Sequence, residues 1–404
     1  MRYSLLLPRQ GDVYHMDQAD SNTLLARLQR LSDPRRKRGR SFEWWYLLAL
    51  IAAALAAGQK TITEISWWIQ QHRTELIEHL HPAKQRLPSY ATLRRVLIAI
   101  DVTALEEEIS SHNQALDSAD ALAGCLVMAD GSLLRGQAVD GKTVRGASAY
   151  GETVHLVSLV RHESGVVLAQ CAVADKSSEI TAVPTLLAGR DLTGTVTTMD
   201  ALLTQRKQAE QVLRQGGHYL MVVKENQGTL YHDLELLFCQ PPALRGEQDM
   251  LTWCDAAAVP AHGRQEKRTL DSSVALNEYL DWPGVGQVLR RTYDSLDRTT
   301  GKTAHEVTYG VTSLSRKQAL PQHSAWFWRQ HWTIENPVHY VRDETMGEDR
   351  CQVHSAHAPE VLAALRNAIL ARLRDQGWTN IAEALRHYSA SPQKALQLIG
   401  ACAT

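Results

Sequence analysis

The chain has 404 residues, which is enough for two or three domains of ordinary size. Its hydrophobic fraction of 44% and charged fraction of 22% are those of a globular protein, which excludes disorder, collagen and coiled coil. The formal net charge of −1 gives no overall basic signal, so a nucleic-acid partner would have to be held by local patches.

Cysteine spacing and the apolar runs indicate the cellular setting. The six cysteines lie far apart and form no C-x-x-C pair, which argues against a zinc ribbon or a disulfide framework and favours a reducing compartment. The longest apolar run, Trp44 to Ala57, is shorter than the ~20 residues of a membrane span, so we interpret it as a buried helix. We expect a soluble, cytoplasmic protein with no membrane partner.

Residues 1–120 have helical apolar spacing and predict an all-α N-terminal domain. A short helix is expected over 22–31, and an apolar helix from Phe42 should end at Gly58, a favourable residue just after a helix. Thr61 and Glu64 form a capping-box pattern that predicts the start of the next helix.

Two segments of this domain are candidates for DNA contact. Ser89 is the expected N-cap of a helix that carries Arg94 and Arg95, and two short helices joined by a turn here fit a helix-turn-helix or a plain helical bundle. A dense cationic run would bind phosphate with release of counterions, unless it is a solvated flexible arm. The residues of this basic run are Arg35, Arg36, Lys37, Arg38 and Arg40.

Short β-branched segments begin near Leu133 and alternate with helices in the order βββαβαβ, which indicates an α/β domain over 121–250. A β-rich insertion is expected over 251–318, followed by helices over 319–404 that complete the α/β core. The predicted strands of that core are 134–144, 154–161, 166–175, 194–200 and 218–226.

Two of these strands run into an aspartate. Asp140 closes one and Asp200 another, which would place both carboxylates at a sheet edge where ligands of α/β folds collect. Asp is also a common turn residue after a strand, so each residue alone has a structural explanation. With Glu335 as a third acid, the set could bind two Mg²⁺ ions about 3.5–4 Å apart for phosphoryl transfer.

Glu335 lies in a segment rich in aromatic and basic residues. A period of 3.6 residues places it on one stripe with Trp328, His331 and Arg342, where the two cationic side chains could accompany a phosphate. The alternative is a partly buried ion-pair face. Pro337 is expected to kink this helix two residues after Glu335 and to carry Arg342 off the stripe.

Several other charged residues are weaker candidates. Glu266 would alternate on a strand with Arg264 and Arg268, as a DNA-phosphate contact, as a solvated edge or as an alternative third metal acid. Three further cations follow the catalytic strands and could steer phosphate or form simple ion pairs: Lys142, Arg145 and Lys224.

Histidines and tryptophans near Glu335 allow two further interpretations. His331, Glu335 and His339 are four residues apart, but the H-E-x-x-H pattern of zinc proteases is absent, so we do not predict zinc. Trp326, Trp328 and Trp332 could stack on an unpaired base.

Six segments, in this order, resemble bacterial insertion-sequence transposases of the ISAs type, a family that includes the H-repeat-associated proteins found beside Rhs elements. The resemblance extends from about Leu31 to the C-terminus, and DPRRKRGR and PSYATLRRVL look like the family's N-terminal domain. The segments are VDGKTVRGA (139–147), TTMDALLTQ (197–205), YLMVVKENQ (219–227), HGRQEKR (262–268), YGVTSLS (309–315) and HWTIENPVHYVRDETMGEDR (331–350).

The resemblance implies a DDE transposase with a ribonuclease-H-like catalytic domain, in which Asp140, Asp200 and Glu335 hold Mg²⁺, or Mn²⁺ in its place. It also implies DNA partners, namely the element's terminal repeats and target DNA, a homodimer on paired ends, and a nucleoid-associated location. Related transposases carry a Tyr-x2-Arg-x3-Glu-x6-Lys signature; here Trp328 replaces the Tyr, His331 the Arg and Arg342 the Lys.

Two rival functions remain open at the level of sequence. A metal-dependent nuclease without strand transfer would use the same three carboxylates. A DNA-binding relic whose catalysis has decayed would explain the altered signature positions.

Overall fold

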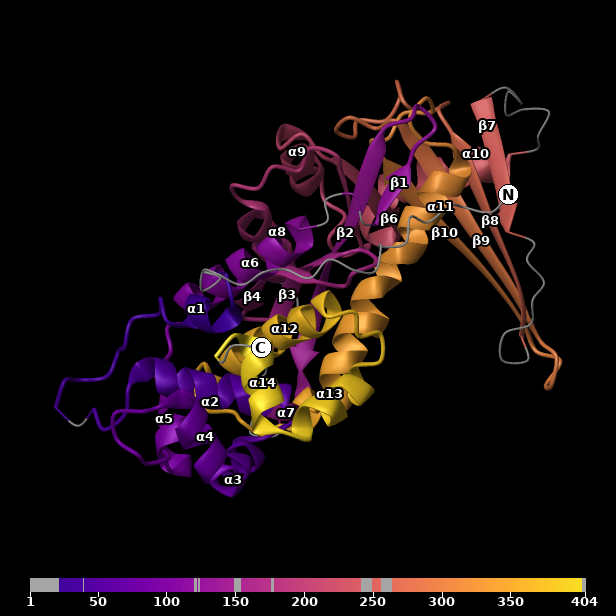
Figure 1. The fold of residues 1–404 in the computed structure, drawn as a ribbon. Coiled ribbons are helices and arrows are strands. Elements are labelled where there is room, and N and C mark those ends of the chain that lie inside the picture. Colours follow the sequence, from indigo (N-terminus) through magenta and orange to yellow (C-terminus); the bar gives the residue numbers. More distant parts are fainter. Residues whose placement is uncertain are drawn as a thin grey trace.

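The structure of the chain is a computed structural model that describes residues 22–38, 40–119, 122, 124–148, 154–175, 178–240, 249–255 and 264–401 (Figure 1). Residues 1–21, Cys402 and the side chain of Arg264 therefore lie outside the described part. Within it, the helices are all too short or too polar to cross a membrane. Of the described cysteines, Cys171, Cys239, Cys254 and Cys351 are free thiols.

One large sheet runs through the molecule. Its strands form where β-branched and aliphatic residues alternate or cluster, and most of them are buried. The strands are β1 (Cys125–Val127), β2 (Leu133–Val144), β3 (Val154–Arg161), β4 (Val167–Val173), β5 (Thr195–Met199), β6 (His218–Val223), β7 (Met250–Asp255), β8 (Arg264–Ser273), β9 (Gln287–Asp297) and β10 (Thr303–Thr312).

The strand order is β4-β3-β2-β5-β6-β10-β9-β8-β7, with β1 paired to β2 outside this path. β2, β5 and β6 are parallel neighbours, and the other pairs are antiparallel. The predicted β-rich insertion is therefore an insertion in sequence only. β10 pairs with β6 from Tyr309↔Val223 to Thr312↔Leu220, so that β7–β10 extend the sheet of the α/β core.

Helices cover both faces of the sheet. On β6, Tyr219 and Met221 pack into one core and Leu220 into another, as the period-two alternation of a strand requires. The first of these cores is covered by α8 (Glu179–Leu187), α9 (Arg206–Arg214) and α10 (Gly228–Cys239), and the second by α11 (Pro321–Gln330). α10 was not among the predicted helices. The helix expected over 201–217 begins only at Arg206, because residues 201–205 form a turn region.

The described residues before β1 are helical, as predicted. Thr61 Oγ1 accepts a hydrogen bond from Glu64 N (3.2 Å) and Ser89 Oγ from Thr92 N (3.4 Å), so both predicted N-caps are confirmed. Gly58, with φ +80°, follows the apolar helix at the expected place. The helices are α1 (Leu24–Leu28), α2 (Trp44–Ala56), α3 (Ile62–Gln71), α4 (Arg73–Leu80), α5 (Tyr90–Ala99) and α6 (Val102–Ser118).

These first helices share one hydrophobic core with the last three, α12 (Ala358–Asp375), α13 (Ile381–Ser389) and α14 (Pro392–Ile399). Figure 1 shows the indigo and yellow helices together at one end and the long strands β8–β10 at the other. α12 also packs on β3 and β4, so it connects the bundle to the sheet. The helix-turn-helix interpretation does not match this bundle, because α4 and α5 are separated by the whole stretch from His81 to Ser89, whereas that motif has a turn of three to four residues.

Short segments connect these elements. The segment that carries Glu335 continues through Pro337 as a π-helix, in which Met346 N donates to Val341 O five residues earlier (2.9 Å). Such wide turns are rare and are often found at functional sites. The remaining segments are α7 (Arg145–Ser148), η2 (Glu225–Gln227), η5 (His331–Thr333), η6 (Ile334–Thr345, the π-helix) and η7 (Glu348–Arg350).

Candidate active site

The parallel pair β2 and β5 brings two predicted acids together. Val139 on β2 is paired with Met199 on β5, so the next residues, Asp140 and Asp200, are neighbours. Asp200 follows the end of β5, whereas β2 continues past Asp140 to Val144, so the prediction that Asp140 closes its strand is wrong. Asp200 also serves as a turn residue, because its Oδ1 accepts a hydrogen bond from Leu203 N (2.9 Å). The two explanations that the sequence left open for this aspartate are therefore compatible.

Glu335 reaches the same place from η6. His339, four residues later, lies between the two acids: its Nδ1 is 3.8 Å from Glu335 Oε2 and 3.9 Å from Asp140 Oδ2. One ligand atom from each of the three residues lies within 4.8 Å of the others. The Asp140 side chain is 15% exposed and that of Glu335 48%, so the cluster is open to solvent on one side.

Among the described residues, no cationic side chain compensates the negative charge of this cluster. Burial, with Glu335 and Asp200 nearby, raises the pKa of Asp140 well above its ordinary value. The imidazole of His339 lowers the pKa of Glu335, whereas burial keeps His339 itself neutral by lowering its pKa. Close carboxylates that repel each other fit a divalent cation, which would relieve both the repulsion and the burial cost.

A fourth carboxylate, on Glu179 at the start of α8, lies close to this site and also raises the pKa of Asp140. It rests on the backbone of Gly141, where an added Cβ would lie 2.2 Å from the Glu179 carboxylate. A side chain at position 141 would therefore have to displace the Glu179 carboxylate. Sequence reasoning missed Glu179, and only the glycine inside a strand hints at such a close approach.

The structure fixes the ring orientation of His331, which lies beside Asp200 and Glu335. Thr198 Oγ1 is hydrogen-bonded to His331 Nδ1 (2.9 Å) and to His162 Nε2 (3.0 Å), and it donates to Gln137 O (3.1 Å). The Thr198 hydroxyl has a single proton, which it donates in the hydrogen bond to Gln137 O. Both histidines must therefore donate to the hydroxyl oxygen. His331 therefore carries its proton on Nδ1, and its Nε2 is left as an acceptor.

His331 is not a cation in this structure, which corrects its predicted role as a phosphate contact. Burial lowers the pKa of His331 to about 4, although Asp200 and Glu335 act in the opposite direction. At neutral pH the ring is neutral, and its Nε2 can accept a hydrogen bond.

Lys142 and Arg342 are also not available for DNA. Arg342 is fully buried and donates to Glu348 through Nη2 (2.8 Å) and to Gln170 Oε1 through Nη1 (2.9 Å). Lys142, 5% exposed at its side chain, is ion-paired with Asp343 and with Glu348 (3.1 Å). Both are structural cations, and the predicted stripe of Glu335 with Arg342 fails because η6 winds more widely than an α-helix.

The pKa of Glu348, the acid bound by Lys142 and Arg342, is shifted in the opposite direction to that of Asp140. Burial alone would raise the pKa of Glu348, but Arg342, Lys142 and Arg366 outweigh it and lower the pKa to about 2. This buried ion-pair group, made of the cations Lys142, Arg342 and Arg366 around Glu348, connects η6 and η7 to β2 and α12.

The other strand acid, Glu266 on β8, is away from the cluster. It is ion-paired with Arg268 and accepts a hydrogen bond from Tyr293 (2.9 Å). Glu266 therefore interacts with side chains of its own part of the sheet. Arg145 and Lys224 are both exposed, after β2 and β6 respectively, and remain candidates for phosphate contact.

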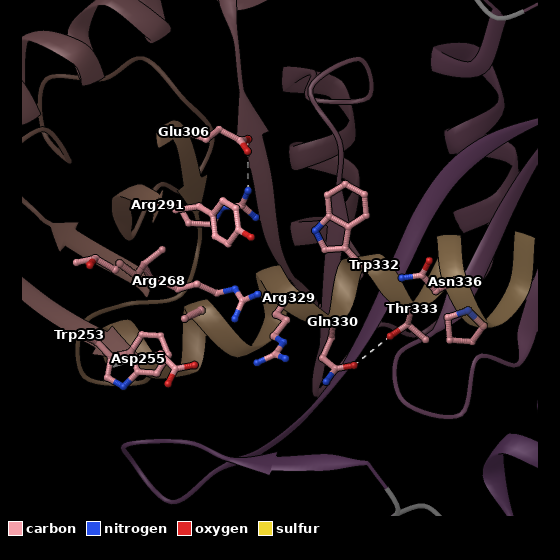
Figure 2. Close-up of a pocket in the computed structure, with 15 residues that line it drawn as sticks. Trp253, Asp255, Arg268, Arg291, Glu306, Arg329, Gln330, Trp332, Thr333 and Asn336 are labelled. Atoms are coloured by element: carbon pink, nitrogen blue, oxygen red, sulfur yellow. Dashed lines mark hydrogen bonds and ion pairs between the residues drawn. The ribbon is translucent and has the colours of Figure 1, made fainter. Parts of the chain in front are cut away.

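A cavity of about 560 Å³ lies between β7–β10 and the segment from α11 to η6. Figure 2 shows Trp332 and three arginines reaching into it, while Asn336 and Pro337, next to Glu335, form one side. Trp332 is 52% exposed, whereas Trp328 is buried in the core. Of the three tryptophans predicted to stack on a base, Trp332 is thus the one that faces this cavity. The arginines are Arg268, Arg291 and Arg329.

The two DNA-binding segments predicted in the N-terminal helices line one groove of about 670 Å³. The basic run contributes Arg35, Arg36 and Arg38, and α5 contributes Arg95 together with Ser89 and Thr92 at its N-terminus. Arg86 also lines the groove, and sequence reasoning missed it because it lies alone in a loop.

Part of the basic run is used within the protein. Asp33 binds Arg35 (2.8 Å) and Arg40 (3.2 Å), whereas Arg36, Lys37 and Arg38 are exposed. Arg94 is exposed outside this lining and donates to Ser355 Oγ (2.7 Å). The groove therefore presents several exposed cations to an anionic ligand.

The chain matches two models of known protein families. Residues 127–372 match the family described as "Transposase DDE domain", and residues 25–112 match the family described as "DDE_Tnp_1-associated". The first match spans the sheet, the three acids and most of α12.

Named relatives point to the same family. The protein named "Putative transposase YncI" of Escherichia coli O157:H7 is 30% identical over 332 residues, which is 81% of each chain. The protein named "H repeat-associated putative transposase YhhI" of Escherichia coli K12 is 26% identical and covers 80% of this chain and 82% of its own. A solved piggyBac transposase synaptic complex with hairpin DNA aligns with 94% of this chain and 79% of its own, with TM-score 0.44 and 8% identity, which is too distant to bear on function.

Proposed function

The chain belongs to the DDE transposase family, and from this membership we propose that it cuts DNA at the ends of an insertion sequence and joins the freed ends to target DNA by two-metal phosphoryl transfer. The observation that carries the proposal is that Asp140 and Asp200 come from two adjacent parallel strands, and that ligand atoms of Asp140, Glu335 and His339 lie within 4.8 Å of one another. The nearby charges of Glu335 and Asp200 raise the pKa of Asp140, which supports a site for a cation.

We include in the proposal that the catalytic core is ribonuclease-H-like. It would consist of β4-β3-β2-β5-β6 with α8, α9 and α12, and the strands β7–β10 would be an extension added between β6 and the helix that carries Glu335. Support comes from the places of the acids: the first on the first long strand of the core, the second after its fourth strand, and the third after the added strands.

The metal chemistry follows from the residue types. Asp140, Asp200 and Glu335 would hold two Mg²⁺ ions, or Mn²⁺, which supply a nucleophile at neutral pH and neutralise charge on the attacking and leaving oxygens. In the first step a water oxygen bonds to the phosphorus at the element end, the bond to the 3′-oxygen breaks, and a proton passes to that oxygen. The unprotonated Nε2 of His331, whose ring is oriented by Thr198, would accept a hydrogen bond from the nucleophile.

In the second step the new 3′-hydroxyl bonds to a phosphorus of the target strand and displaces a target 3′-oxygen. Both steps exchange one phosphodiester or water oxygen for another, so they need no covalent protein intermediate. That fits a cluster of carboxylates and neutral histidines with no serine, cysteine or tyrosine nucleophile among its members.

DNA would be held at two places. The arginine-lined groove of the N-terminal helices would bind the backbone of the terminal repeat, and the exposed Arg145 and Lys224 would contact phosphate near the acids. The cavity with Trp332 and Arg329 would take an unpaired base at the cut end, by stacking and charge. Pairing of two ends implies a homodimer.

The test is a strand-transfer assay. DNA flanking the gene is first searched for short inverted repeats bordered by direct duplications. The full chain is then incubated with labelled end DNA, a supercoiled target plasmid and Mg²⁺ or Mn²⁺. Joined products that require both the end sequence and the metal are expected; ends cut but never joined would identify a nuclease, and binding without cleavage a decayed relic.

Asp200→Asn is the decisive variant in this assay, because it removes one charge at the sheet edge and retains the size of the side chain. Asp191→Asn, an exposed aspartate in the loop before β5, is the matched control. Products that persist in Asp200→Asn would overturn the assignment of the site.

A further inference from the structure

We propose that His339 is a metal ligand, which together with Asp140 and Glu335 forms a mixed nitrogen and oxygen site that favours Mn²⁺ over Mg²⁺. The inference rests on the proposed function and specifies the metal chemistry of the same site. It adds the imidazole of His339 to the three acids. The sequence did not indicate His339 as a ligand, because its spacing from His331 and Glu335 differs from the H-E-x-x-H pattern of zinc proteases.

The distances suit a bound ion better than direct contact. His339 Nδ1 lies 3.8 Å from Glu335 Oε2 and 3.9 Å from Asp140 Oδ2, which is beyond the ~3.2 Å reach of a hydrogen bond. Two atoms that are each about 2.1 Å from one ion lie roughly 3.0–4.2 Å apart, from adjacent to opposite octahedral positions. Both separations fall within that range.

Hydrogen bonding within the described residues does not explain why this histidine is buried. The residue is 5% exposed, and its Nε2 makes no hydrogen bond to any described group. A buried polar atom without a partner is unfavourable for the folded state, so hydrogen bonding gives no reason for the burial of this ring. Because Nδ1 faces two carboxylates, the ring has the position of a metal ligand.

An ordinary ion pair does not account for the arrangement either. The cations closest in sequence to the cluster, Lys142 and Arg342, are committed to Glu348. His331 makes its hydrogen bond to Thr198. No described side chain with a fixed positive charge thus lies between the acids, and a neutral imidazole in that place contributes a lone pair instead.

The ligand set selects among divalent ions. Mg²⁺ prefers carboxylate and water oxygen, whereas imidazole suits the first-row transition metals, so a histidine shifts the preference toward Mn²⁺ and the later ions. Asp200, next to Asp140 but outside the three-residue group, remains for a second, oxygen-only ion. The two positions of the proposed site are therefore chemically unequal.

The experiment is electron spin-echo modulation of Mn²⁺ bound to the full-length protein. A ¹⁴N modulation from a coordinated imidazole is expected, and it should change when the protein is made with ¹⁵N-histidine, which needs no variant. His339→Gln should lose the modulation, bind Mn²⁺ at least about tenfold more weakly and reduce the ratio of the Mg²⁺ to the Mn²⁺ dissociation constant. His331→Gln, at the other histidine beside the acids, is the matched control and should retain the modulation.

A wild-type protein without histidine modulation, or a modulation that survives in His339→Gln, would overturn the inference. The outcome stays separate from that of the proposed function through Asp140→Asn. If Asp140→Asn loses Mn²⁺ binding while His339→Gln binds like the wild type, only the role of His339 fails. If Asp140→Asn binds Mn²⁺ as the wild type does, the metal site itself fails.

Discussion

Two clusters of charge lie side by side on the same elements and have opposite characters. Asp140 and Lys142 are two residues apart on β2, and Glu335 and Arg342 both lie on η6. The buried ion-pair group around Glu348 has three cationic side chains and is closed to solvent. The acid cluster has carboxylates and neutral histidines, and it is open.

The difference shows how to separate a structural ion network from a functional one. In the first, paired charges lower the pKa of Glu348 to about 2 despite its burial; in the second, like charges and burial raise the pKa of Asp140. An acid with a shifted pKa is a functional candidate when the shift comes from neighbouring acids whose charge no described cation neutralises. The two clusters therefore predict opposite effects of the same kind of substitution.

The largest expected effect is that of Asp140→Asn on strand transfer. Activity should fall by more than about a thousandfold, because a carboxylate that binds the ions and faces the developing charge is removed. The free energy of unfolding of the metal-free protein should rise, since the substitution removes a buried carboxylate that its neighbours repel. Strand-transfer assays and urea unfolding in a chelating buffer measure the two quantities.

A metal-free Asp140→Asn protein that is markedly less stable than the wild type would break the comparison. It would mean that Asp140 belongs to a network that stabilises the fold, like Glu348.

Glu348→Gln should have the reverse effect, a loss of stability of about 3–5 kcal/mol, because it leaves buried cations without their main acid. Since the pKa of Glu348 is lowered from 4.5 to about 2 in the folded state, its contribution is fully present above about pH 4.5 and is lost as the pH falls toward 2. Urea unfolding between pH 2 and 7 should show that this part of the acid dependence is absent in the variant.

The matched control is Glu344→Gln near the end of η6, four residues before Glu348, where the acid and its partner Arg350 are largely exposed. Its stability should change by less than about 1 kcal/mol. Equal losses in the two variants would show that the buried group contributes no more than a surface pair.

The sequence predicted the acids better than it predicted the cations. Asp140 and Asp200 could be singled out because an aspartate within or after a run of β-branched residues is a local property of the pattern. That β2 and β5 lie side by side is not a local property, since their paired residues are about 60 residues apart. The partners of Lys142 and Arg342 could not, because Glu348 reaches them only through the wide turns of η6. Whether a cation faces DNA or a buried acid is decided by tertiary packing.

The same limit applies to the fold. Two N-caps, Thr61 and Ser89, follow from local residue patterns, as do the core strands. The joining of β10 to β6 and the shared core of α2 and α12 connect segments far apart in the chain, which single-sequence periodicity does not contain. The sequence indicates that His339 is close to Glu335 but not that it is close to Asp140, because that contact joins η6 to β2, about 200 residues apart in the chain.

The arginine groove gives an effect of intermediate size. Replacing Arg36, Arg38 and Arg95 by alanine should weaken binding to end DNA and reduce the slope of log affinity against log salt by about 0.9 for each phosphate that is no longer neutralised. Fluorescence anisotropy over a range of salt concentrations measures this. Arg214→Ala, an exposed arginine of α9 outside the groove, is the control, and an equal change in slope there would show a nonspecific charge effect.

The smallest expected effect is that of Thr198→Val, which tests how the acid cluster keeps its histidine neutral and oriented. The valine removes the acceptor of His331 Nδ1–H and of His162 Nε2–H but leaves all the acids in place. Loss of an orienting partner typically costs 10–100-fold, so we expect strand transfer to fall by about that factor with little change in DNA affinity. The ¹⁵N shifts of His331 should show the proton no longer confined to Nδ1.

Thr195→Val, three residues earlier on β5, makes the same substitution away from the two histidines and should retain activity. If Thr198→Val keeps both its activity and the His331 tautomer, the ring is oriented by the acids themselves. The tautomer and orientation of His331 would then be set by the charge of the neighbouring acids rather than by its hydrogen bond to Thr198. His331 would in that case belong to the acid cluster itself.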